Sequence, residues 1–524
     1  MIWQLDENAL TLQRKREKEK KMKKLLFFFL LCCSLTTRSQ DNFTWEVTMQ
    51  TTNSTGDYTP LWLNANKHGL SSLDKNNGYL MAGVKKSMES DSLKRWSYGF
   101  GASLAAAYNF TSPVVVQEAY AEGRWLKGVL TIGSKEWQME LKNDTLSSGS
   151  QTFGINARPV PQVRIALPDY WTFAGGWLGI KGHIAYGMTT DDGWQKDFTD
   201  KKSKYTENVL YHSKSGYLRI GNVEKTRLSV ELGLEMASLF GGTSYRKWEN
   251  GELVGIKNGT GLSSFWNAFT GGGSDVGEVV YQNVEGDMLG SWVARVNYDA
   301  PTWNIGVYAD HYFDDHSAMF FLDYDGYGEG TEWNVKKDNR YYLYDLKDIM
   351  LGAELTLKKC PWARKIVVEY LYTKYQSGPI YHDHTENIPD HIGGNDRYYN
   401  HGIFTGWQHW GQVMGNPLYM SPLYNTDGTI EVKDNRFIAW HGGVSGSLSN
   451  ALEYRLLATY QKGWGTYNNM YPHPRRNASL LAEATYSFHS SGWQLTAAVA
   501  MDKGSLLGDN VGLQLTVVKK GVFK

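Results

Sequence analysis

The residues best suited to chemistry are concentrated between positions 381 and 418. This stretch holds five of the 13 histidines, together with tryptophan, tyrosine, glycine and amide residues. Tryptophan and tyrosine rings stack on the C–H faces of sugar rings, while Asp, Asn, Arg and His side chains hydrogen-bond hydroxyls and carboxylates. The pattern therefore favours saccharide binding. The residues that we expect to contact the saccharide are Asp396, Arg397, Tyr398, Tyr399, Trp407, His409 and Trp410.

Two other interpretations of the same stretch stay open. In the first, His382 and His384 form the His-x-His spacing of a zinc or copper site, although the remaining histidines are irregularly spaced. In the second, the aromatic residues belong to a plug loop and pack against the wall of a barrel. Neutral imidazole is common in polar loops, so we expect no metal site and no cofactor.

Carboxylate pairs that a hydrolase would need occur at Asp314-Asp315 and at Asp323 and Asp325. A chain with 54 acidic residues produces such pairs by chance, and a glycosidase pair is defined by distance rather than by spacing. The stretch Asp323–Gly326 lacks the remaining ligands of a calcium loop. The sequence has no nucleophile elbow, P-loop or zinc-protease motif. We therefore expect no catalytic residues and no enzyme activity.

The composition narrows the class of protein that must position these residues. The 524 residues include 54 basic and 54 acidic ones, and the mean hydropathy is −0.45, which is too polar for a bundle of membrane helices. Glycine (55) and aromatic residues (14%) are abundant and proline (13) is scarce, so the chain does not resemble a disordered one. The balanced charge argues against nucleic acid as a partner, because that function needs a basic stripe.

The N-terminus resembles an export signal. A basic stretch at 20–24 precedes nine apolar residues at 25–33, and small residues stand before a cleavage point at Gln40. The apolar run is too short to span a bilayer and matches a secretory signal. We predict a cleaved signal peptide at 22–39 that starts at Met22, and an upstream extension, residues 1–21, that reflects a misassigned start.

A lipid anchor is the alternative for this segment, but Leu31 precedes Cys32 where such an anchor needs a small residue. After cleavage the chain holds 45 basic and 50 acidic residues, a net charge of about −5. Cys360 is then the only cysteine, which excludes a disulfide within the mature chain.

Beyond residue 39 the sequence alternates apolar with polar or small residues. The clearest segments are 43–49, 96–108, 228–236, 493–501 and 511–517, and several begin or end in an aromatic residue. Successive side chains of a strand point to opposite faces, so each segment has one apolar and one polar face. A soluble β-sandwich or propeller also alternates, but a blade-length repeat is absent.

A sheet in lipid must pair every backbone group, so it must close into a barrel. We therefore predict an all-β fold, a transmembrane antiparallel β-barrel in which 511–518 pairs with 43–49. Roughly 25–30 residues per strand and connection give about 16–20 strands. The barrel occupies residues 40–524 as a single domain, and its largest loop spans 377–429.

A set of short sequence motifs occurs in order along nearly the whole mature chain. They are Gln117–Tyr120, Thr131–Glu136, Asn156–Gln162, His212–Lys214, Gly233–Glu235, Phe240–Gly242, Leu289–Trp292, Phe313–Asp315, Glu369–Thr373, Gln376–Pro379, Tyr398–Asn400, Gly415–Leu418, Gly463–Tyr467 and Leu507–Gly512. With the export signal and the alternation, they resemble the capsule assembly Wzi family.

This resemblance implies an outer-membrane barrel of 18 strands in a Gram-negative bacterium, with a small helical or loop plug near the periplasmic side. It also implies a lectin-like role in attaching capsular or other surface polysaccharide, without catalysis. The implied partners are that polysaccharide and outer-membrane lipid, and the candidate protein partners are the barrel-assembly and polysaccharide-export machinery. The alternatives are a porin-like channel for saccharides or other solutes, an outer-membrane enzyme acting on glycan or lipid, and a structural barrel that holds a partner assembly.

Overall fold

The computed structural model describes residues 43–523 except 89–94, 273–284, 315–320, 325–327, 343–346, 382–391 and 489–490. The predicted N-terminal extension and signal peptide therefore lie outside the described residues, as do His382 and His384 of the His-x-His motif. Residues Thr44–Val522 form one compact unit.

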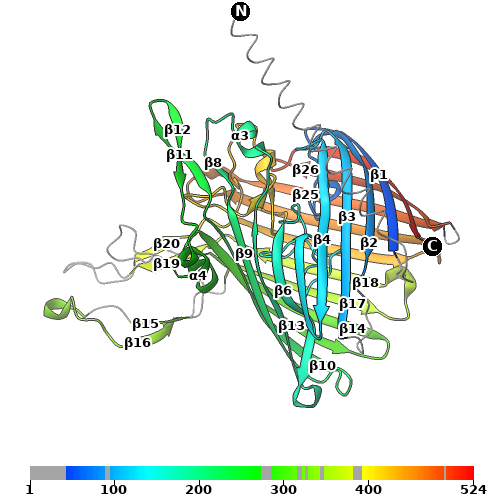
Figure 1. Cartoon of the computed structure of the whole chain (residues 1–524), viewed down its shortest axis with the longest axis horizontal. Coiled ribbons are helices and arrows are strands. Elements are labelled where there is room, and N and C mark those ends of the chain that lie inside the picture. The colour runs from blue at the N-terminus through cyan, green and yellow to red at the C-terminus, as the bar shows by residue number, and fades with distance from the viewer. Residues whose placement is uncertain are drawn as a thin grey trace, which may run out of the picture. The chain divides into compact units, whose positions relative to one another are not determined.

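Eighteen strands of this unit form one sheet (Figure 1). They are β1 (Phe43–Thr55), β2 (Asn76–Lys86), β3 (Trp96–Tyr108), β4 (Val114–Trp125), β5 (Gly128–Ser134), β6 (Gln162–Phe173), β7 (Leu178–Met188), β9 (Leu210–Ile220), β10 (Leu228–Phe240), β13 (Asp287–Asp299), β14 (Trp303–Asp314), β17 (Ile349–Leu357), β18 (Lys365–Tyr372), β23 (Phe437–Ser447), β24 (Leu452–Gly465), β25 (Met470–Phe488), β26 (Trp493–Gly504) and β27 (Asn510–Val522).

The sheet closes on itself. Each strand pairs with its neighbour in the chain order of this sheet, and β27 returns to pair with β1 from Thr44↔Val522 to Thr55↔Val511. Closure pairs the backbone groups of both edge strands, which a sheet surrounded by lipid requires. The predicted antiparallel barrel, its strand number and its closing pair are confirmed.

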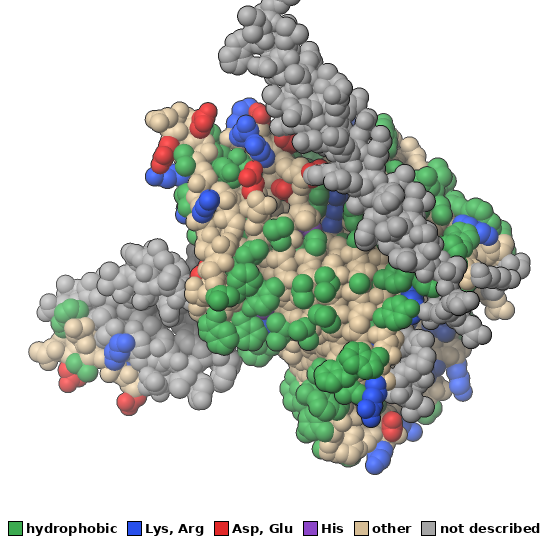
Figure 2. All heavy atoms as spheres, in the orientation of Figure 1, with side chains coloured by type: hydrophobic (Ala, Val, Ile, Leu, Met, Phe, Trp, Pro, Cys, Tyr) green, Lys and Arg blue, Asp and Glu red, His purple; other side chains and the backbone are tan. Residues whose placement is uncertain are grey.

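Alternation along each strand separates a lipid-facing from a lumen-facing side. On β27, Val511, Leu513 and Leu515 are 51%, 47% and 40% exposed, whereas Gln514 between them is 3% exposed and donates to Leu63 O in the lumen. Figure 2 shows hydrophobic side chains across the middle of the visible wall, with most charged side chains beyond it. None of the helices in the described ranges has both the length and the hydropathy that a membrane span requires.

The two ends of the barrel differ in their connections. At the end where β1 begins and β27 ends, the links are short, for example 126–127 and 300–302. The opposite end carries the long connections, among them 241–286 and 373–436, and the second contains the predicted loop 377–429. Bacterial outer-membrane barrels have short periplasmic turns and longer extracellular loops, so we refer to these as the periplasmic and extracellular ends.

The long connections contain small elements of their own. These are α2 (Leu61–Asn64), α3 (Trp194–Phe198), α4 (Leu262–Thr270), a sheet of β8 (Tyr205–Glu207), β11 (Thr243–Glu249) and β12 (Glu252–Lys257), the hairpins β15 (Phe321–Tyr324) with β16 (Asn339–Tyr342), β19 (Ser377–Tyr381) with β20 (Ile392–Asn395) and β21 (Gln408–His409) with β22 (Gln412–Val413), and the 3₁₀ turn η4 (Pro422–Tyr424). Further 3₁₀ turns in the periplasmic links and the β14–β17 connection are η1 (Ala174–Gly176), η2 (Gly330–Glu332) and η3 (Pro361–Ala363).

Three connections fold back into the lumen, and we call residues 56–75, 135–161 and 396–436 the plug. Together with inward-facing strand residues they form the main hydrophobic cluster of the molecule. The plug enters from the extracellular end and is mostly irregular backbone, with one four-residue helix, α2. It nevertheless reaches deep, because Thr145 O accepts from Arg455 Nη1 near the periplasmic start of β24. The plug is thus of the loop type among the two types that the resemblance implied, and it enters from the extracellular end and reaches toward the periplasmic side.

Candidate functional site

A buried ion pair is the first of two contacts between the plug and carboxylates of the wall. Lys142 Nζ lies 2.8 Å from Asp310 Oδ2 on β14, and the two side chains are 1% and 0% exposed. The backbone N–H of Gln151 donates to the same carboxylate oxygen at 3.1 Å, and the Gln151 side chain donates to Asp310 O at 2.9 Å. A buried charge is tolerated only when it is paired and hydrogen-bonded, and Asp310 receives both from the plug.

A second carboxylate, that of Glu369 on β18, accepts hydrogen bonds from three donors. Ser147 Oγ and Tyr308 OH donate to Oε1 at 2.5 and 2.6 Å, and the backbone N–H of Ser148 donates to Oε2 at 2.8 Å. Glu369 is 1% exposed, so these bonds replace the water that the carboxylate has lost. Carboxylates of the barrel wall therefore fix the backbone of 142–151 in the lumen.

The aromatic residues of the predicted saccharide site pack in the same interior. Trp407 is 1% exposed, stacks on Tyr211 of β9 with ring centroids 5.9 Å apart, and donates from Nε1 to Thr152 O at 3.0 Å. Tyr399 is 2% exposed, stacks on Tyr419 at 4.0 Å and donates to Gln151 O. These rings are fully engaged, so a glycan cannot stack on them in this conformation.

Tyr398, Asp396 and His409 are buried as well. Tyr398 is 0% exposed and donates to Asp348 Oδ2 at 3.0 Å, while the backbone N–H of Asp396 donates to Gln376 O. His409 Nδ1 donates to Arg158 O at 2.8 Å. Its Nε2 accepts the backbone N–H of Thr190 at 3.0 Å, which requires a neutral ring.

Burial also sets the protonation of His409. Removal from water lowers the pKa of this imidazole to about 4, because the charged ring would lose its hydration inside the plug. The nearby Arg158 guanidinium acts in the same direction. His409 is therefore a structural hydrogen-bonding group of the plug at neutral pH.

Two of the seven predicted residues keep accessible surface. The side chain of Arg397 is 37% exposed and its Nη2 lies 2.6 Å from Glu431 Oε1. Trp410 is partly exposed at the turn between β21 and β22, with the Arg158 guanidinium over its ring at 4.2 Å. All seven predicted residues therefore lie in the plug, but only Arg397 and Trp410 have side chains that a ligand can reach.

The extracellular ends of β23, β24 and β25 present a second group of aromatic and basic side chains that the saccharide prediction omitted. The Arg436 guanidinium lies 3.7 Å from the Tyr467 ring, and Lys374 and Lys462 lie 4.5 and 4.9 Å from the Trp464 ring. Trp464 and Tyr467 are both partly exposed. The sequence motif Gly463–Tyr467 could have indicated these exposed aromatic residues, since they alternate with glycine and threonine.

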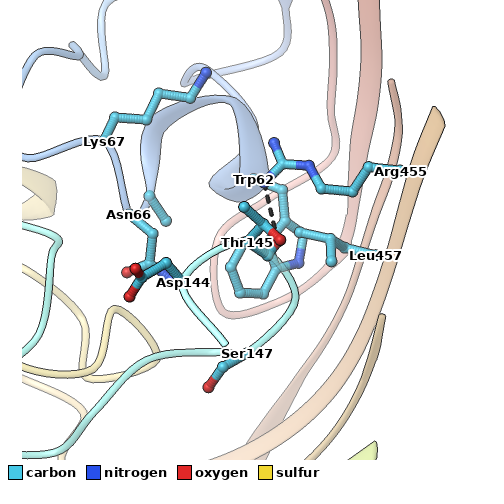
Figure 3. A pocket seen from close by; sticks show the side chains of 9 residues that line it. Trp62, Asn66, Lys67, Asp144, Thr145, Ser147, Arg455 and Leu457 are labelled. Carbon is cyan, nitrogen blue, oxygen red and sulfur yellow. Dashed lines mark hydrogen bonds between the residues drawn. The ribbon is translucent and has the colours of Figure 1, made fainter. Parts of the chain in front are cut away.

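A small cavity lies between the plug and the wall (Figure 3). It has a volume of about 30 Å³ and lies beside Trp62, Asp144 and Arg455. A space of this size accommodates little more than water. Among the described residues no group of three or more His, Cys, Asp or Glu side chains is placed to hold a metal ion.

The sequence matches no family profile and no curated protein. Solved structures do match. The chain is similar to Wzi of Escherichia coli, described as an outer membrane protein involved in group 1 capsule assembly and a carbohydrate-binding β-barrel, with a TM-score of 0.52, 12% identity and coverage of 90% of this chain and 83% of that one.

Two structures from Pseudomonas aeruginosa are also similar. OprD has a TM-score of 0.43, 10% identity and coverage of 93% and 96%, and OccK2 in complex with glucuronate has 0.44, 8%, 92% and 98%. The likeness to the Escherichia coli barrel supports the fold, which is that of an outer-membrane β-barrel.

Proposed function

We propose that the protein is a plugged outer-membrane barrel that binds capsular or other surface polysaccharide at its extracellular end and holds it at the cell surface. In this proposal the barrel anchors the site, the plug closes the lumen, and no bond of the polysaccharide is made or broken. The chain then has the same general role as the Escherichia coli barrel whose description names carbohydrate binding.

The observation that carries the proposal is the packing of the plug. Residues of 135–161 bond to wall residues on β14, β18 and β24, including the buried Lys142–Asp310 pair. The other two plug connections also bond to β24, since Trp62 donates to Thr459 and Leu418 O accepts from Gln461. A channel needs a continuous water-filled path, whereas these contacts fill the lumen with side chains. Binding at the mouth therefore fits this interior better than passage of solutes through it.

The proposed contacts are the accessible aromatic and basic side chains of the rim. Arg397 and Trp410 remain from the predicted set, and Trp464 and Tyr467 extend the surface. Tyrosine and tryptophan faces suit sugar rings, and arginine suits hydroxyls and carboxylates. The buried members, Asp396, Tyr398, Tyr399, Trp407 and His409, support this surface from below.

Each of these contacts alone is weak. A polymer meets several copies of the barrel and several repeat units at once, so weak contacts add through effective concentration. Surface retention of the polymer then depends on the density of the protein as well as on the affinity of one site.

The test compares Arg397→Ala and Trp410→Ala with the control Trp362→Ala, whose side chain is 64% exposed on the periplasmic side. Binding of purified surface polysaccharide from the producing cells is measured with barrels in vesicles. We expect about a tenfold loss for each rim variant, because one contact contributes roughly 1.4 kcal/mol. The control should bind as the unchanged protein does.

Planar-bilayer conductance distinguishes the rival function. The unchanged barrel should give little current under conditions in which an open 18-stranded porin conducts. A steady open-channel current with undiminished conductance in both rim variants, together with no polysaccharide binding, would identify a porin and overturn the proposal. Turnover of the polysaccharide would identify an enzyme and overturn it as well.

A further inference from the structure

The helix α4 lies on the outside of the barrel, beside β9 at the extracellular end (Figure 1). On β9 the odd-numbered residues face the lumen, since Tyr211 stacks on Trp407 of the plug and Tyr217 OH donates to Glu235 Oε1 at 2.7 Å. The even-numbered residues His212 and Lys214 therefore face outward. Both of them contact α4.

Aromatic packing attaches the helix to the wall. The Phe265 ring lies between Tyr186 of β7 and Phe240 of β10, with centroid distances of 5.2 and 5.1 Å. Tyr186 OH also donates to Phe265 O at 2.9 Å. Ala268 on the same face is 2% exposed. One face of α4 is therefore a fixed part of the outer wall.

The C-terminal end of α4 accepts a hydrogen bond from a charged side chain on the lipid-facing side of the wall. Lys214 Nζ donates to Phe269 O, one of the last carbonyls of the helix, and lies 4.7 Å from the Phe269 ring centroid. Carbonyls in the last turn have no partner within the helix and carry the negative end of its dipole. The ring of His212 lies 5.8 Å from the same Phe269 ring. Two polar side chains that would otherwise meet lipid are thus covered.

The side of α4 away from the wall exposes two apolar side chains next to the polar Ser263 and Thr270. Leu262 and Trp266, one turn apart, are 91% and 64% exposed, and the helix contains no charged residue. The neighbouring outward residue Ile184, which is paired in register with Lys214, is 45% exposed. Leu262 and Trp266 therefore continue the apolar surface that the strands present to lipid.

We propose that α4 is an interfacial helix embedded in the outer leaflet, with Leu262 and Trp266 among the acyl chains of the leaflet lipid. Tryptophan is favoured at the membrane interface, and an uncharged helix with Leu262 and Trp266 exposed is stabilised when acyl chains cover these two side chains. The helix widens the barrel on one side and fixes its height in the membrane. This inference depends on the barrel fold and not on polysaccharide binding.

Site-directed spin labelling tests the proposal in the full mature chain. In a chain of residues 40–524, Cys360→Ser removes the remaining cysteine, and Trp266→Cys or Leu262→Cys receives the nitroxide. Ile184→Cys is the lipid-exposed control and Glu252→Cys, exposed on β12, is the aqueous control. The barrels are placed in phosphatidylcholine vesicles, and collision with oxygen is compared with collision with a water-soluble nickel chelate.

We expect the labels at 262 and 266 to behave like the label at 184, with frequent oxygen collisions and several-fold fewer nickel collisions than at 252. Frequent nickel collisions at both helix positions would place α4 in water and overturn the proposal. Infrequent collisions with both reagents would show that protein, such as a second copy of this chain, covers the helix, and would overturn it too. Heat-dependent gel mobility confirms that each variant is folded.

Discussion

Two connections leave the same end of the barrel and finish on opposite sides of its wall. The β5–β6 connection, residues 135–161, turns inward, and its residues 142–151 bond to carboxylates of β14 and β18. The described part of the β10–β13 connection places α4 outside the wall, against β7, β9 and β10. The side chains of each loop account for the side of the wall on which it lies.

Each loop matches the surface that it covers. The inward segment 142–152 is rich in Asn, Ser, Thr and Gln, whose donors satisfy Asp310 and Glu369 in a lumen without bulk water. The outward segment presents Phe265 to the rings of Tyr186 and Phe240, and it covers Lys214 with the ring and carbonyl of Phe269. Polar side chains on the lipid side would lack hydrogen-bond partners there. Aromatic rings in place of the inward donors would leave the buried carboxylates of the wall unpaired.

The largest effect is expected when the wall carboxylate that pairs with the inward loop is removed. Asp310→Ala leaves the Lys142 ammonium buried without a counter-charge, which costs about 3–5 kcal/mol. We expect the plug to loosen and planar-bilayer conductance to rise. The double variant Asp310→Leu with Lys142→Met removes both charges and should conduct much less. Equal, low conductance in the single variant would show that the ion pair does not hold the plug.

A milder change at the second anchor should have a smaller effect. Glu369→Gln leaves one acceptor oxygen for the three donors of Ser147, Ser148 and Tyr308, with an expected loss of about 2–3 kcal/mol. Protease cleavage within 135–161 measures the release of the loop, with the exposed Glu453→Gln as the control. Cleavage at the same rate in both variants would exclude Glu369 as an anchor.

Acid should loosen the plug. The pKa of His409 is about 4 in the folded plug against 6.5 for an ordinary histidine, so the folded state binds fewer protons than the unfolded one. The stability that this group contributes is complete above about pH 6.5 and falls as the pH drops toward 4. Conductance should therefore rise across this range.

The variant His409→Gln separates this residue from other acid effects. Glutamine donates to Arg158 O and accepts from the Thr190 N–H without titrating, so the rise in conductance should be shallower. His401, whose pKa burial lowers to about 3, keeps part of the dependence. A pH profile unchanged by the substitution would show that His409 does not contribute.

The smallest effect is expected on the outward loop. Phe265→Ala removes the ring between Tyr186 and Phe240 and should lower the unfolding free energy by about 1–2 kcal/mol, since Phe265 is only partly buried. Trp266→Ala, on the lipid side, should change it by less than about 0.5 kcal/mol. Urea unfolding in vesicles measures both. A larger loss for Trp266→Ala than for Phe265→Ala would reverse the assigned faces of α4.

The barrel could be predicted from the sequence because its signal is local. Alternation with period two is visible within each strand, and the segment predicted at 96–108 has the same bounds as β3. The pairing of β27 with β1 followed from the need to close every edge in lipid. Lipid acts uniformly on all strands, so no knowledge of particular distant partners was needed.

The position of the candidate site residues could not be predicted in the same way. Trp407 and Tyr399 look like exposed loop aromatics until Thr152 and Gln151, about 250 residues earlier, supply their hydrogen-bond acceptors. Lys142 meets Asp310 across a separation of 168 residues. Loops lack a periodic pattern, so nothing in the sequence near these residues specifies which side of the wall they reach.

The plug connections also bear on the order of assembly. Each of them leaves the extracellular rim and returns to it, so none passes through the barrel from one end to the other. The pairing of β27 with β1 can therefore seal the wall before any of these segments is in place, and they can enter afterwards without threading a chain end. Filling the lumen is thus topologically independent of closing the eighteen-stranded wall, because no chain end has to pass through the barrel.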